Sequence, residues 1–282
     1  QYCGEKDQRG EPRNQYGACD LGAFEFDTAP ILYVDVNAAS RANQANSGLC
    51  DPGECWALAY DSLQDALAVP GVYDVHVADG VYYPDVGSSQ ANNDPSSSFL
   101  IPSSHKIYGG YAGIGGENLP TDSGMYKTIF SGDIDENDVD NNSDGIIEST
   151  EDLVGDNALH VITAADDSLF LEGVTVTAGM AKGLTGQTNI VQGIIDPDKN
   201  SAAIQKIGSD LLTINVNQVA FYGNWAVEGG GVTKDCYVLN ANDLVVIGNT
   251  ADTGLAGAII CPFSNITNAL FQGNKAATQG GA

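Results

Sequence analysis

The chain has 282 residues and carries 37 acidic against 11 basic side chains, so its formal net charge is −26. Such a surface repels nucleic acids and anionic lipids, which bind to basic patches, and this excludes both as partners. Its 34 glycines argue against a helical protein, and no apolar run approaches the about 18–20 residues that a membrane span needs. The acidity suits either divalent cations or solubility outside the cell.

Residues 1–28 are charged and irregular, and a short linker joins them to an expected strand at residues 31–37. The best helix lies at residues 61–68, where Asp61 or Ser62 can cap it and Pro70-Gly71 ends it. A helix this short persists only when it is docked on something. We expect it to cover the end of a stack of strands, whose unpaired backbone groups need a cap.

Alternating apolar and polar residues, rich in β-branched side chains, predict short strands along the rest of the chain. Turn residues separate the strands, and the absence of intervening helices argues against βαβ units. The expected strands are residues 72–77, 81–83, 99–101, 106–108, 128–130, 159–162, 169–177, 211–216, 219–222, 237–239, 244–247, 258–260 and 269–271.

The sharpest chemical motif lies in an acidic insertion at residues 133–152. There, Asp140-x-Asn142-x-Asp144-Gly145 followed by Glu151 fits the EF-hand loop at every fixed position. Oxygen ligands alternate in such a loop and the glycine permits a sharp turn, so we expect Ca²⁺ as the cofactor. The predicted ligands are Asp140, Asn142, Asp144, the carbonyl of Ile146, Glu148 through water, and Glu151. Without flanking helices the loop would stiffen the structure; a merely solvated acidic loop is the alternative.

A 25-residue spacing organises the C-terminal part of the chain. Gly223-Asn224, Gly248-Asn249 and Gly273-Asn274 each open a Gly-Asn-x-Ala tetrapeptide. A constant period of this size is typical of stacked repeats. With about three short strands per period, it predicts an all-β, right-handed parallel β-helix, a solenoid of about 25 residues per coil. The related segment ending at Ala181 lies further away, which predicts a loop insertion at residues 182–201.

Side chains at matching positions of the repeats should stack on one another. The apolar ones are expected to point inward, and the asparagines to occupy a tight corner, where they tolerate a left-handed backbone and bond from coil to coil. The columns are Val219, Leu244 and Ala269; Phe221, Val246 and Phe271; and Asn224, Asn249 and Asn274.

The cysteines fall into three local pairs and lack the spacing of a zinc site. The pairs are Cys3 with Cys19, Cys50 with Cys55, and Cys236 with Cys261. They predict disulfides and an oxidising exterior. Buried free thiols are the alternative, and it is strongest for the third pair, because neighbouring strands bring two Cα atoms into range without setting the torsion.

Several motifs carry a resemblance to a known group of proteins. In order, they are Tyr33-Val34-Asp35-Val36-Asn37, residues 59–67, Val77-Ala78-Asp79-Gly80-Val81-Tyr82-Tyr83-Pro84, residues 107–113, residues 128–135, Gly173-Val174-Thr175-Val176 and the Gly-Asn-x-Ala repeats. Over residues 31–282 the chain resembles the secreted bacterial right-handed β-helix proteins related to polymorphic outer-membrane-protein adhesins. The resemblance implies export, a surface or adhesin-like role, and no catalytic residues.

The same resemblance divides the chain into residues 1–28 and a β-helix domain at 29–282. Residues 17–26 resemble the segment that closes such a β-helix at its C-terminal end, although here they stand first. We therefore expect one period of a longer array, or a subunit whose open coil stacks on the next subunit. A shortened chain is the duller alternative.

These observations predict a non-enzymatic extracellular or cell-surface protein, structural or adhesive, that assembles head-to-tail into filaments or arrays and is stiffened by calcium. Glycans or a cell surface are further expected partners. The alternative is a carbohydrate-active β-helix enzyme, either a polysaccharide lyase or similar to a glycoside hydrolase. Scarce basic residues argue against a lyase, whereas chance pairs of carboxylates leave hydrolysis open.

Overall fold

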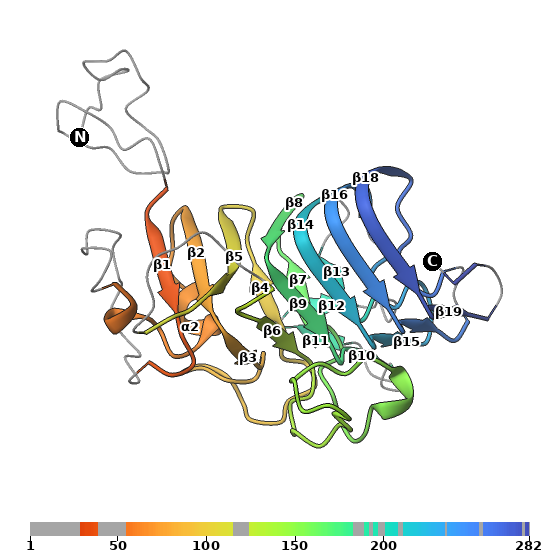
Figure 1. The fold of residues 1–282 in the computed structure, drawn as a ribbon, viewed down its shortest axis with the longest axis horizontal. Helices are drawn as coiled ribbons and strands as arrows, with labels where there is room; N and C mark the ends of the chain where they lie inside the picture. Colours follow the sequence, from red (N-terminus) through yellow and green to blue (C-terminus); the bar gives the residue numbers. More distant parts are fainter. Residues whose placement is uncertain are drawn as a thin grey trace, which may run out of the picture.

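The computed structural model describes residues 29–38, 55–114, 124–182, 189–191, 194–196, 201–207, 211–234, 236–253, 256–277 and 280–281. This part of the chain is mostly parallel strands in several sheets (Figure 1). Among the described residues, helix comprises α2 (Leu63–Leu67), the 3-10 turns η1 (Trp56–Leu58) and η2 (Thr150–Asp152), and Cys55. The expectation of a mostly β protein with parallel strands is thus confirmed.

The main sheet runs along the length of the molecule (Figure 1). Its first half follows the order β1 (Ile31–Val34), β2 (Tyr73–Ala78), β5 (His105–Tyr111), β8 (Ser168–Glu172) and β14 (Leu212–Tyr222). Its second half follows β3 (Gly80–Tyr82), β6 (Thr128–Ser131), β9 (Val174–Thr177) and again β14. The strands β16 (Cys236–Ile247) and β18 (Phe263–Gln272) extend both halves beyond β14.

The long strands pass from one half of the main sheet to the other at residues in the left-handed backbone region. Gln218, Asp243 and Asn268 have φ values of 53, 52 and 51°, and they occupy the same position of three strands. Gly173 lies at the matching point between β8 and β9. The single strand expected at residues 169–177 is therefore interrupted, whereas those expected at 211–216 and 219–222 are one bent strand.

Shorter strands form further sheets. Two-residue strands from the repeats and from their related segment make one sheet: β10 (Met180–Ala181), β15 (Trp225–Ala226), β17 (Thr250–Ala251) and β19 (Lys275–Ala276). A second sheet contains β13 (Ile204–Lys206), β7 (Ile162–Ala164) and β4 (Phe99–Ile101). The antiparallel pair β11 (Asn189–Val191) and β12 (Ile194–Asp196) belongs to the insertion predicted at 182–201. The strand expected at 159–162 begins instead at Ile162, and that at 258–260 contributes one bridge, from Ile259 to Thr233.

The predicted apolar columns are in register. Val219 pairs with Leu244 and that residue with Ala269, while the second column pairs in the same way. The β14 and β16 members of both columns are at most 2% exposed, so they belong to the core. On β18 every residue is exposed, because no described strand covers its free edge.

Helix α2 confirms the expected position of a helix near residues 61–68. Its apolar side chains Leu63, Ala66 and Leu67 are buried in the main core, and the helix contacts β1 and β4. It therefore packs near the β1 end of the main sheet (Figure 1). The predicted cap is wrong, since Ser62 makes no side-chain capping bond and its hydroxyl instead donates to the carbonyl of Val86.

The asparagine column forms a continuous hydrogen-bonded ladder. Nδ2 of Asn224 donates to Oδ1 of Asn249 at 2.9 Å, and Nδ2 of Asn249 donates to Oδ1 of Asn274 at 3.1 Å. Asn224 and Asn249 are fully buried. The predicted bonding from repeat to repeat is confirmed. The reason given for asparagine at the corner is wrong, because the left-handed backbone falls on the preceding glycine, with φ of 56° at Gly223.

Cys236 and Cys261 form a disulfide, with their Cα atoms 4.8 Å apart, so the free-thiol alternative is wrong for this pair. Cys55 is also disulfide-bonded. Cys3, Cys19 and Cys50 lie outside the described residues, as does the segment 1–28.

Replacing both Cys236 and Cys261 by serine is expected to lower the free energy of unfolding by about 3 kcal/mol, because a loop of this length then regains its freedom in the unfolded chain. Urea unfolding at neutral pH measures the difference. The double variant is preferable to reduction, which would also open the disulfide of Cys55. An unchanged unfolding midpoint would show that the crosslink contributes nothing.

His76, on β2, is packed among aromatic rings from β1 and β5. Its ring stacks on Tyr111 at 4.5 Å between centroids and meets Tyr33 and Tyr108 edge-on, each at 5.6 Å. Burial lowers its pKa to about 4. Since the unfolded chain binds this proton near pH 6.5, the neutral ring stabilises the fold above that pH, and the contribution is lost as pH falls toward 4.

We therefore expect wild type to lose about 3 kcal/mol more stability than His76→Phe between pH 7.5 and pH 4. The comparison isolates His76 from carboxyl groups that titrate in the same range. Chemical unfolding of both proteins at a series of pH values measures it, and parallel stability profiles would contradict the assignment.

Candidate functional site

The most distinctive surface feature is the acidic segment, which we define as residues 133–157. It contains no Lys or Arg and follows directly after β6. The segment lies beside the ends of β9, β14 and their neighbours (Figure 1). It holds the region in which sequence predicted the calcium loop.

The acidic segment crosses successive strands of the repeats. Thr177 on β9 accepts a hydrogen bond from the backbone N–H of Ile147 and donates one to its carbonyl, at 3.0 and 2.9 Å. Further along, the hydroxyls of Thr150 and Thr250 lie 3.0 Å apart. Lys275 then reaches Glu151 at 2.8 Å. The segment thus joins parts of the chain that lie up to 124 residues apart in sequence.

Two repeat glycines leave room for the backbone of the acidic segment. A Cβ atom at Gly223 would lie 2.2 Å from the carbonyl oxygen of Ile147, and one at Gly248 would lie 2.0 Å from that of Glu148. At Gly273 the nearest atom would be 3.9 Å away. The glycines of the Gly-Asn-x-Ala motif therefore serve both the left-handed turn and, at the first two repeats, this close contact.

In the first half of the predicted calcium loop, the backbone turns around the carboxylate of Asp140. Asp140 accepts hydrogen bonds from the backbone N–H groups of Asn142, Ser143 and Gly145. Slight burial acts to raise the pKa of Asp140, but these N–H groups outweigh it and hold the pKa below its ordinary value. Gly145 has φ of 80°, as the sharp turn predicts.

Predicted ligands from both halves of the loop have other partners. Glu151 pairs with Lys275, which lowers the pKa of the Glu151 carboxyl. Asp144 pairs with Lys127 at 2.8 Å, and Glu148 accepts from the amide of Asn142 at 2.8 Å. Among the described residues, no three His, Cys, Asp or Glu side chains are grouped to hold a metal ion. The predicted ligands are therefore not gathered around one point, and closure of the loop by Glu151 would require that residue to leave Lys275.

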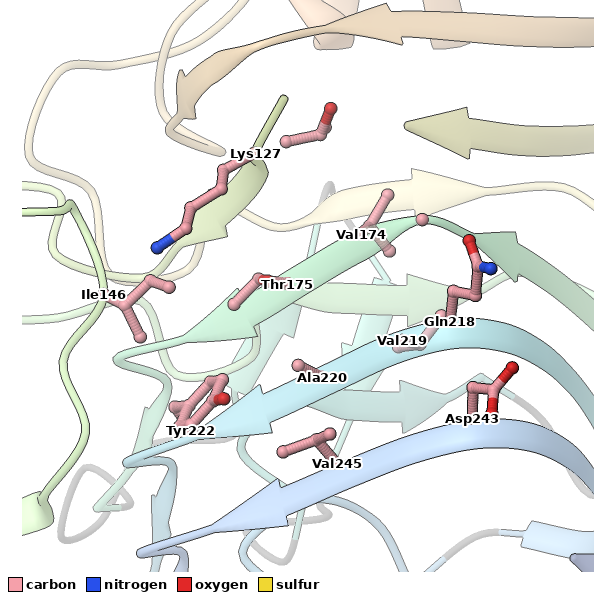
Figure 2. A pocket seen from close by; sticks show the side chains of 12 residues that line it. Lys127, Ile146, Val174, Thr175, Gln218, Val219, Ala220, Tyr222, Asp243 and Val245 are labelled. Carbon is pink, nitrogen blue, oxygen red and sulfur yellow. The ribbon is translucent and has the colours of Figure 1, made fainter. Parts of the chain in front are cut away.

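A groove of about 350 Å³ lies beside the acidic segment (Figure 2). Thr175, Ala220 and Val245 project into it from β9, β14 and β16. Lys127, Ile146 and Tyr222 line one end, and Gln218 and Asp243, two of the left-handed residues, line the other. The groove therefore combines an apolar floor with a cation, a phenol and polar groups.

Tyr222 keeps its proton at neutral pH. Burial raises the pKa of its phenol, nearby Lys127 lowers it, and Glu148 and Asp144 raise it. The phenol can therefore donate a hydrogen bond into the groove. Tyr82 and Tyr111 are 3 and 8% exposed and pack in the interior.

Sequence reasoning missed the groove and a second asparagine ladder. Nδ2 of Asn240 donates to Asn215, and Nδ2 of Asn265 donates to Asn240, at 3.0 and 2.9 Å. The 25-residue spacing of these asparagines could have revealed the ladder. No sequence signal predicts the groove, because the segments that line it include Lys127 and Ile146, which lie outside the 25-residue repeats.

Comparison of the chain with protein-family models, curated proteins and solved structures finds no match. The resemblance to β-helix adhesins stays a prediction. In the part of the chain that the structure describes, no helix has the length and hydropathy needed to cross a membrane.

Proposed function

We propose that the chain is a right-handed parallel β-helix of about 25 residues per coil and that it serves as a non-enzymatic extracellular structural or adhesive protein. The parallel, in-register pairing of β14, β16 and β18 supports the coil length. The position of α2 near β1 supports a short capping helix. The disulfide of Cys236 supports an oxidising compartment, outside the cell or at its surface.

The single observation that carries the structural role is the edge of β18, which no strand among the described residues covers. Ile266 continues a column whose members Val216 and Ala241 are 5 and 6% exposed, yet Ile266 is 41% exposed. Phe271 ends a second such column at 36%. An uncovered parallel edge with apolar side chains is a template for another strand. We assign a second copy of the chain, stacked head-to-tail, as the partner of this edge. Contact with glycans or a cell surface is a further proposed role, for the faces of the sheets away from this edge.

Calcium is the proposed stiffening cofactor. Asp140, Asn142 and Asp144 would hold it together with the carbonyl of Ile146, and Glu148 would act through water. Bound there, the ion would fix the middle of the acidic segment and so strengthen its contacts with Thr177, Gly223 and Gly248. Glu151 would complete the set once it separates from Lys275.

The groove favours a second candidate function, a carbohydrate-active enzyme. Its apolar floor and polar ends suit a sugar chain, and Lys127 is a basic group beside carboxylates. Lys127 is already paired with Asp144, however, so it is poorly placed to accept a proton. Cleavage of an acidic polysaccharide by the purified protein would favour this second candidate.

Sedimentation velocity over a concentration series tests the structural proposal. Wild type should associate as concentration rises, and Ile266→Lys should stay monomeric, because it places a charge on the stacking face. Leu270→Lys is the matched control, because Leu270 is similarly exposed. Leu270 pairs with Val245, whose side chain lines the groove, so Leu270 does not continue a buried column. A wild type that stays monomeric, or equal association of both variants, would contradict the proposal.

A further inference from the structure

A second group of oxygen atoms lies at the two ends of the acidic segment, apart from the EF-hand-like loop. The first end is a tight turn after β6 in which Asp133 accepts hydrogen bonds from the backbone N–H groups of Asn137 and Asp138, at 3.0 and 3.3 Å. Glu136 adopts a left-handed backbone with φ of 52°. The turn carries three aspartates, Asp133, Asp135 and Asp138, whose carboxylates are not by themselves grouped to hold a metal ion.

The second end of the segment returns to the same turn and supplies a buried amide. Asn157 is fully buried, and its Nδ2 donates to Oδ2 of Asp138 at 2.6 Å and to the carbonyl of Ala178 at 2.9 Å. At Gly155, with φ of 77°, a Cβ would lie 2.5 Å from Oδ2 of Asp135. The backbone of residues 155–157 is therefore packed against the carboxylates.

Two oxygen atoms of this cluster are buried without a hydrogen-bond partner. They are Oδ1 of Asp135 and Oδ1 of Asn157, and the second sits on the amide that is already bonded to Asp138. Leaving such an atom unsatisfied destabilises a fold. The nearby cation Lys182 binds Asp156 and the carbonyl of Gly155 instead.

Charge at the cluster is also uncompensated. Among the described residues, no Lys or Arg pairs with Asp133, Asp135 or Asp138. Oxygen ligands with excess negative charge are the environment that hard divalent cations prefer. Three carboxylates do not already converge on one point, so the amide oxygen is needed to complete the set.

We infer that Asp135, Asp138 and the amide oxygen of Asn157 form a second divalent-cation site, suited to Ca²⁺ and separate from the loop Asp140–Glu151. A cation there would satisfy both unpartnered oxygens and would join the beginning of the acidic segment to its end. The segment would then be closed into a ring above the strands that it crosses. This inference is independent of calcium binding by the loop.

Calorimetric titration of chelator-treated protein with Ca²⁺ alone tests the inference. The double variant Asp135→Asn/Asp138→Asn should bind one equivalent of Ca²⁺ less than wild type. The double variant Asp140→Asn/Asp144→Asn should still bind that equivalent. If the loop does not bind, wild type should take up one equivalent, and the first variant should abolish it. Unchanged stoichiometry in the Asp135/Asp138 variant would overturn the inference whatever the loop does.

Asn157→Asp provides a check that does not depend on removing ligands. The change keeps the shape of the side chain but adds a fourth carboxylate in place of the donor to Asp138. Without Ca²⁺ the variant should melt below wild type, and saturating Ca²⁺ should raise its melting temperature by more than it raises that of wild type. A purely structural role for Asn157 predicts a loss that Ca²⁺ does not restore, and that result would overturn the inference.

Discussion

Alanine at Gly223 or Gly248 is expected to destabilise the protein by about 3–5 kcal/mol. Both residues have positive φ, at 56 and 68°, which costs an L side chain about 1–2 kcal/mol. The added Cβ would also meet a backbone carbonyl of the acidic segment at 2.2 or 2.0 Å. Because that contact is with backbone, relief requires the segment to move away from the strands. Chemical unfolding of each variant measures the loss.

Gly273→Ala is the matched control, because it has the same turn but no overlying segment. Its φ is 65°, and its Cβ would find no atom closer than 3.9 Å. It should lose about 1–2 kcal/mol, the cost of the backbone conformation alone. Equal losses of unfolding free energy at all three glycines would mean that the acidic segment is not in close contact with Gly223 and Gly248.

Asn224→Ala or Asn249→Ala is expected to cost about 3 kcal/mol. Asn224 is fully buried; its Nδ2 donates to Asn249 and to the carbonyls of Val176 and Tyr222, and its Oδ1 accepts from the N–H of Gly179. Truncation leaves these buried backbone groups without partners. Thermal and urea unfolding should both report the loss.

Asn242→Ala tests whether burial decides the effect. Asn242 also donates across one repeat, to Asn217 at 2.9 Å, but its side chain is exposed and water replaces the lost bond. The free energy of unfolding of Asn242→Ala should lie within about 0.5 kcal/mol of that of wild type. A cost similar to that of Asn224 would show that the ladders stabilise by something other than satisfying buried groups.

The repeat period allowed much of the fold to be predicted. It identified which residues pair between β14, β16 and β18, and which side chains stack, because one constant spacing relates all of them. The same spacing led to the ladder at Asn224 and Asn249. Where no period exists, as at residues 159–162, the strand boundary was misplaced, since a short apolar run does not show where pairing starts.

The bends and the contacts of the acidic segment could not be predicted. Left-handed backbone at Gln218, Asp243 and Asn268 falls on three different residue types, so composition does not mark it. The pairing of Glu151 with Lys275 joins distant residues that no motif relates. An EF-hand pattern also predicts which side chains could bind a cation. It does not predict that one of them pairs instead with a lysine of a neighbouring strand, as Glu151 does with Lys275.

We propose that this chain is a structural β-helix that stacks end to end. Electron microscopy of the purified protein in millimolar calcium tests it most directly. We expect unbranched filaments of uniform width that shorten or vanish in Ile266→Lys and persist in Leu270→Lys. Isolated particles the size of one 29.3 kDa chain at every concentration would contradict it.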